Sequence, residues 1–65
     1  MRKYTIQTYI ANTQLSSLVN AKTVTATSSL EALIDESTLW KKKGVSSFFI
    51  EVFSAKGQRL AILVR

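Results

Sequence analysis

Cysteine and histidine are both absent from the 65 residues of this chain, and their absence removes several kinds of chemistry. Without cysteine the fold has no disulfide, and we expect no zinc site because sulfur and imidazole nitrogen are the usual zinc ligands. The same two residue types also supply the commonest general bases and nucleophiles. We therefore expect no catalytic residues, no metal and no cofactor, in a protein that is not an enzyme.

Proline is also missing, and glycine occurs twice. Two isolated glycines do not make a glycine-rich phosphate-binding loop. No apolar run approaches the roughly 18 residues that cross a membrane. The segment after Met1 alternates between polar and apolar residues, instead of forming the apolar centre of a signal peptide. These features predict a cytoplasmic protein that does not contact a membrane.

The chain is short and basic. Its length suits a single domain, here residues 1–65, whose core supplies only about 3–5 kcal/mol of net stability. Oligomerisation or a partner would add to that stability. The net charge of +5 favours an anionic partner, which could be DNA, RNA or an acidic protein surface. The alternative is that the charge serves solubility alone.

Hydrophobic alternation predicts four strands. They are expected over Lys3–Ile10, Lys22–Thr27, Val45–Ser54 and Arg59–Arg65. A turn is expected over residues 11–14, and the stretch that follows, up to Asn20, fits either one turn of helix or a loop.

A helix is predicted between the second and third strands. Ser28 and Glu31 have the spacing of a capping box, and Gly44 has the place of a helix-ending glycine. The apolar stripe expected to face the sheet consists of Leu30, Leu33, Ile34 and Trp40. Leu39 points about 180° away from Leu30 and does not fit this stripe. The elements predict an α+β fold in which one helix packs on one face of a small antiparallel sheet, in the order β-β-α-β-β.

The last two strands form a hairpin whose loop is Ala55-Lys56-Gly57. The expected register pairs Ser54 with Gln58, Val52 with Leu60, Ile50 with Ile62 and Phe48 with Val64. It places an apolar set on the sheet face that the helix does not cover. The outward set is Phe49, Phe53 and Leu63, with Arg59 and Arg65 beside it.

This outward set is the predicted partner interface, since contiguous exposed apolar surface marks interaction sites. A second copy of the chain, giving a homodimer, would bury it. Two alternatives stay open: the segment 12–20 covers this face, or the aromatic rings stack on nucleic-acid bases. A basic patch of Lys41, Lys42, Lys43 and Lys56 would contact phosphates or an acidic protein, or serve the helix dipole and solubility.

The stretch Thr23–Leu33, in which a strand runs into the helix start Ser29-Leu30-Glu31-Ala32, resembles small accessory proteins of phages and mobile elements. The β-β-α-β-β layout, size and basic charge are similar to those of some anti-CRISPR proteins. The resemblance implies a non-enzymatic inhibitor or modulator that occupies a site on a host protein or nucleoprotein complex.

Overall fold

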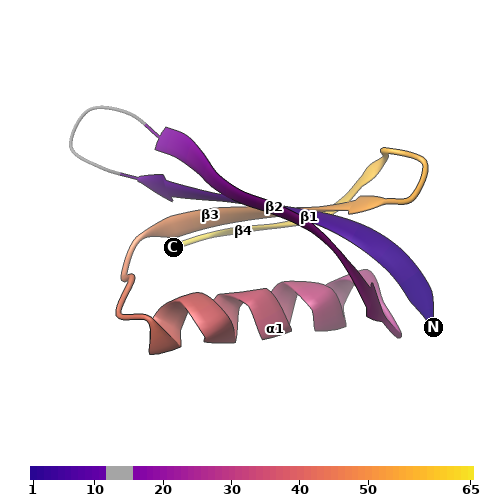
Figure 1. The fold of residues 1–65 in the computed structure, drawn as a ribbon, viewed down its shortest axis with the longest axis horizontal. Helices are drawn as coiled ribbons and strands as arrows, with labels where there is room; N and C mark the ends of the chain where they lie inside the picture. The colour runs from indigo at the N-terminus through magenta and orange to yellow at the C-terminus, as the bar shows by residue number, and fades with distance from the viewer. Residues whose placement is uncertain (12–15) are drawn as a thin grey trace.

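One helix packs on one face of a four-stranded antiparallel sheet (Figure 1). The computed structural model describes residues 1–11 and 16–65, with side chains for 1–10 and 20–65. The elements in chain order are β1 (Arg2–Ala11), β2 (Ser16–Ala26), α1 (Ser29–Lys42), β3 (Phe48–Ser54) and β4 (Arg59–Val64). The predicted α+β class and the order β-β-α-β-β are confirmed.

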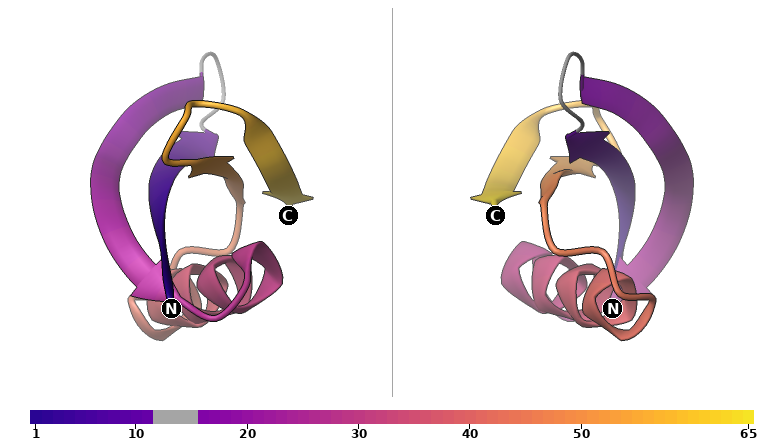
Figure 2. Two further views of the ribbon diagram at one scale, coloured as in Figure 1. Left: turned by 90° about the vertical axis from the view of Figure 1, so that its right-hand side faces the viewer. Right: turned by 90° about the vertical axis from the view of Figure 1, so that its left-hand side faces the viewer.

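The strand order is β2-β1-β3-β4, so β1 and β3 lie at the centre of the sheet and β2 and β4 form its edges. Side chains alternate across a strand, and every second residue of the central strands therefore faces α1. The most deeply buried of these apolar side chains are Tyr4, Ile6, Phe48, Ile50 and Val52. Figure 2 shows the sheet curving around α1, which lies across the concave face.

β2 begins earlier than expected. Residues 16–20, predicted as a helical turn or a loop, belong to β2, whose pairing with β1 extends to Ala11 opposite Ser16. Both expectations for these residues are wrong, because pairing along a long hairpin outweighs a short apolar pattern. The turn predicted over 11–14 lies, from residue 12 onward, outside the described residues.

α1 begins where the capping box predicts. The Ser28 hydroxyl accepts a hydrogen bond from the Glu31 N–H at 3.1 Å. The Glu31 carboxylate accepts from the hydroxyl and N–H of Thr27, one residue earlier than the expected partner Ser28. The Thr27 hydroxyl, and then its N–H, lower the pKa of Glu31. After α1, Gly44 adopts a φ of 83°, which suits a glycine that ends a helix.

α1 turns a different face to the sheet from the predicted one. Its buried residues are Ala32, Leu33, Glu36, Ser37 and Trp40. Leu30 and Ile34, which were expected in the core, are 60% and 55% exposed. At about 100° per residue, the observed face is rotated from the predicted face by roughly 60°.

Among the described residues, no helix is long and apolar enough to cross a membrane.

The turn between β3 and β4 has the predicted chemistry. The Ser54 N–H donates to the Gln58 carbonyl at 2.8 Å, and the Gly57 N–H donates to the Ser54 carbonyl at 2.9 Å. Gly57 has a φ of 89°, in the left-handed region that this loop needs and that glycine reaches without steric cost.

Beyond the turn, the predicted hairpin register is wrong. Val52 lies opposite Ala61 instead of Leu60, and a register shift separates this pair from Phe53 and Arg59. One extra residue of β4 therefore forms a bulge next to the turn. Because the side-chain period is two, a shift of one residue moves every later side chain of β4 to the other face.

Candidate functional site

Two grooves flank α1 on the concave side of the sheet. The groove toward β2 holds a cavity of about 360 Å³, and the groove toward β4 holds one of about 250 Å³. Their chemistry differs, because the first contains the paired Lys22 and Glu36 together with Asp35, whereas the second is lined mainly by apolar residues with basic side chains beside them.

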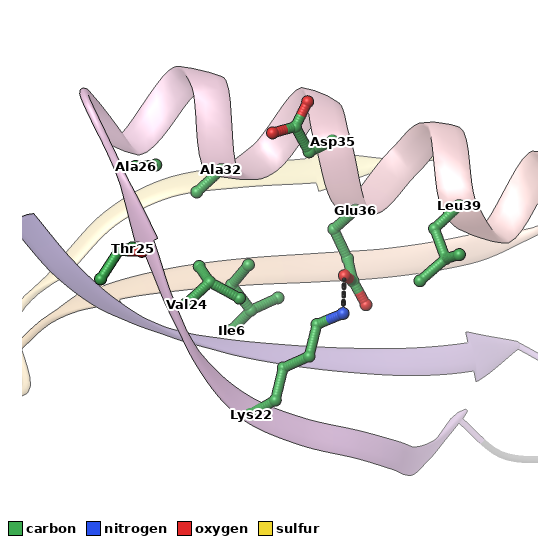
Figure 3. Close-up of a pocket in the computed structure, with 9 residues that line it drawn as sticks. All are labelled: Ile6, Lys22, Val24, Thr25, Ala26, Ala32, Asp35, Glu36 and Leu39. Atoms are coloured by element: carbon green, nitrogen blue, oxygen red, sulfur yellow. Dashed lines mark ion pairs between the residues drawn. The ribbon is translucent and has the colours of Figure 1, made fainter. Parts of the chain in front are cut away.

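Glu36 is the central polar residue of the groove toward β2 and is only 3% exposed. Its Oε1 lies 2.7 Å from Nζ of Lys22, which extends from β2 (Figure 3). Its Oε2 accepts hydrogen bonds from Nε1 of Trp40 at 2.7 Å and from the hydroxyl of Thr8 at 3.3 Å. No buried polar side-chain atom lacks a partner within the described part of the chain.

Burial acts to raise the pKa of Glu36, but three hydrogen bonds and one positive charge outweigh it. The bonds come from Lys22, Trp40 and Thr8, and the charge is that of Lys22, so the pKa lies below its ordinary value of 4.5. The carboxylate is therefore ionised at neutral pH and fully paired inside the protein. This arrangement ties α1 to β1 and β2.

The Glu36 network also explains why the helix face differs from the predicted one. Lys22 and Thr8 face α1 from β2 and β1, so Glu36 must point toward the sheet to reach them. That rotation turns Leu30 and Ile34 toward the side of β4. The misfit of Leu39 was the sequence signal for this rotation: Leu39 contributes to the groove toward β2, where a rotated helix would place it.

The groove between α1 and β4 is lined by apolar residues, two hydroxyl side chains and two basic residues. Its lining residues are Leu30, Leu33, Ile34, Ser37, Thr38, Lys41, Leu63 and Arg65. Leu33 is buried and Leu63 packs against the core, while Leu30 and Ile34 stand exposed on the helix flank. Two of the lining residues are positively charged and none is negatively charged.

The outer face of the sheet, opposite α1, differs from the prediction at β4. Phe49 and Phe53 lie on it and are half-buried, and the Phe49 ring packs against Tyr9 with ring centroids 5.4 Å apart. Leu63, predicted to lie beside them, faces the core because of the bulge. Ile62 and Val64 occupy the outer face instead, with 44% and 70% of their surfaces exposed.

Arg59 also lies at the outer face, where its guanidinium contacts the Glu51 carboxylate at 3.3 Å. Burial, followed by the neighbouring Glu51 carboxylate, raises the pKa of Tyr9 on the same face. Residues 16–20, part of the segment 12–20 named above as an alternative cover for this face, run within β2 beside β1. The remainder of that segment, residues 12–15, lies outside the described residues.

Exposed apolar side chains thus gather on both sides of β4. We call this set the β4 surface, and it consists of Leu30, Ile34, Leu60, Ile62 and Val64. Sequence reasoning missed all five as site residues, because their exposure depends on the helix rotation and the β4 bulge.

The predicted basic patch is divided between the two ends of the molecule. Lys41–Lys43 lie at the C-terminal end of α1, whereas Lys56 lies in the β3–β4 turn at the opposite end (Figure 1). Nζ of Lys43 lies 4.8 Å from the ring centre of Trp40, a cation–π distance. Arg65 joins Lys41 in lining the groove between α1 and β4.

No known protein family, curated protein or solved structure matches this chain. Its function is therefore assigned from its own surface chemistry, and the resemblance to phage accessory proteins stays a prediction.

Proposed function

We propose that this protein is a non-enzymatic binding module that acts by occupying a surface of another protein, as an inhibitor or modulator. The observation that carries the proposal is the β4 surface, whose five large apolar side chains are exposed around one edge of the sheet. Large apolar side chains that gather on an exposed surface are typical of protein interfaces. We expect the protein to act in the cytoplasm.

The energetic argument supports an interface that a partner covers. Burying one large apolar side chain contributes roughly 1.5–3 kcal/mol, and several such residues together rival the about 3–5 kcal/mol that a core of this size supplies. Covering the β4 surface with a partner would therefore contribute a free energy comparable to the net stability of the fold.

The placement of the carboxylates supports a role without catalysis. Three of the four acidic side chains have partners: Glu31 is hydrogen-bonded to Thr27, Glu36 is enclosed by its own network, and Glu51 is paired with Arg59. The fourth, Asp35, is exposed and lines the groove toward β2. Paired carboxylates that serve capping and packing are not poised to exchange protons with a substrate.

Affinity capture from cells of the source organism, followed by mass spectrometry, tests the proposal. Ile34→Asp places a charge on the β4 surface at an exposed helix position, and Thr23→Asp places the same charge on the exposed side of β2 as a matched control. We expect wild-type protein and Thr23→Asp to retain the same proteins after nuclease treatment, and Ile34→Asp to lose them. Equal retention by all three variants, or loss of all partners on nuclease treatment, would refute the proposal.

A second candidate function is direct binding of DNA or RNA. It is supported by the gathering of Lys41, Lys42 and Lys43 at the end of α1 with Arg65 nearby in the same groove. Phosphate binding through these side chains would weaken steeply as salt rises, because counterions are released. Mobility shifts at low and moderate salt, compared between wild-type protein and Lys42→Ala, separate this candidate from the first.

A further inference from the structure

The two edges of the sheet differ in how they are protected from pairing with another strand. β2 carries Lys22 on the face toward α1, where it pairs with Glu36. An inward-pointing charge is one of the devices that keep an edge strand from adding a further strand, along with proline, bulges and edge lysines. β4 lacks these devices over Ala61–Val64, since its bulge lies before Ala61 and this stretch has no charge and no proline.

The pairing of β4 with β3 determines which backbone groups are free. The Arg65 N–H donates to the Phe48 carbonyl at 2.9 Å, and bonded and non-bonded pairs alternate along an antiparallel ladder. Ala61 and Leu63 therefore direct their N–H and C=O groups toward β3. Ile62 and Val64 direct theirs toward the open edge, where no strand pairs with them in the part of the chain that the structure describes.

From this edge we infer that β4 accepts an extended segment of another protein as a fifth strand, and that this segment is apolar at alternate positions and acidic at its ends. The inference rests on the proposed function and names the kind of partner. Backbone bonds to Ile62 and Val64 would hold the segment, as in other cases of strand addition. Its alternate side chains would enter the apolar groove between α1 and β4, beside Leu63 and Ile34.

The charge around β4 selects the chemistry of the added segment. Arg59, whose guanidinium also contacts Glu51, precedes the free edge, and Arg65 follows it. Lys41 shares the groove with Arg65, and none of the described residues that line the groove is acidic. Acidic residues at the ends of the added segment would therefore meet opposite charge at this edge.

The same charges disfavour a second copy of this chain as the added strand in the register centred on Ile62. Antiparallel self-pairing about Ile62 would place Arg59 opposite Arg65 of the second copy, twice in the dimer. Like charges directly opposite one another destabilise a strand pair, and each molecule carries a net charge of +5.

A labelled peptide tests the inference directly. The probe is a short fluorescein-labelled peptide with valine at alternate positions and glutamates at both ends. Its binding to the protein is measured by fluorescence anisotropy at low salt. We expect saturable binding below about 1 mM, which weakens as salt rises. A peptide with lysines in place of the glutamates, and a peptide N-methylated at the backbone positions that would bond to β4, should each bind about tenfold or more weakly.

Protein variants locate the binding edge. Ile62→Pro removes the N–H that faces the open edge, a position where an edge strand tolerates proline, and Ile62→Thr is the matched control that keeps this N–H. We expect about tenfold weaker binding by Ile62→Pro than by Ile62→Thr. Because the N-methylated peptide is tested on the wild-type protein, the inference stays testable even if Ile62→Pro fails to fold.

Several results would overturn strand addition at β4. The first is that the glutamate peptide does not bind, and the second is that the lysine peptide or the N-methylated peptide binds as tightly as the glutamate peptide. The third is that the wild-type protein sediments as a dimer and Ile62→Pro sediments as a monomer. The last result would assign the edge to a second copy. If folded Ile62→Pro captures the same cellular proteins as wild type while Ile34→Asp does not, strand addition at β4 is refuted but the proposed function is supported.

Discussion

Truncating Glu36 tests whether its buried network holds α1 against the sheet. Glu36→Ala removes the acceptor for the Trp40 indole N–H and the Thr8 hydroxyl, and the counter-charge of Lys22. Thr8 is fully buried and Trp40 is nearly so. Their donors are therefore left without a protein partner.

The expected loss follows from those orphaned donors. Each buried donor without a partner costs about 1–3 kcal/mol. The Lys22 side chain is 35% exposed, and its ammonium can turn toward solvent at smaller cost. Two such donors together cost about 2–6 kcal/mol, which is comparable to the about 3–5 kcal/mol that a core of this size supplies. We therefore expect Glu36→Ala to be largely unfolded or close to its unfolding midpoint at 25 °C.

Urea denaturation measures this loss, with the fluorescence of the single tryptophan and far-ultraviolet circular dichroism as two probes. Glu36→Gln keeps an acceptor and the side-chain shape, so it should lose less stability than Glu36→Ala. Asp35→Ala is the matched control, because Asp35 is exposed on the same helix, and should stay within about 0.5 kcal/mol of wild type. If Glu36→Ala unfolds at the same urea concentration as Asp35→Ala, the buried network does not stabilise the fold.

Three further predictions concern the same fold. Because the pKa of Glu36 is held below 4.5, its ionised carboxylate contributes fully to stability above that pH, and the contribution is lost as pH falls through the folded-state pKa. Lys22→Met removes part of what lowers this pKa, so the difference in unfolding free energy between wild type and Lys22→Met should become smaller from neutral pH to pH 4. Urea titrations at several pH values measure this difference, and a constant difference would contradict the reasoning. Gly57→Ala places a side chain at a φ of 89° and should cost about 1–2 kcal/mol in thermal unfolding, whereas no loss would mean that the turn adopts another conformation. Ser28→Ala removes the helix cap and should cost about 1 kcal/mol, which urea denaturation with helical circular dichroism would detect.

Local chemistry was enough to predict where most elements begin and end. The helix start depends on Ser28 and Glu31, which are three residues apart. The turn between β3 and β4 depends on Gly57, which has a left-handed conformation. Such signals involve only neighbouring residues, so the structure they predict does not depend on the rest of the fold. The alternation of apolar and polar residues also predicted strands at the positions of β1, β3 and β4.

Two features of the candidate site were decided only by the tertiary structure. Glu36 meets Lys22 and Thr8 from two other strands, so the rotation of α1 depends on long-range partners that its own apolar pattern does not contain. One extra residue at the start of β4 exchanges Leu63 for Ile62 and Val64 on the outer face. A periodicity of two carries no information about such a bulge, because either register gives the same alternation until β3 and β4 are paired.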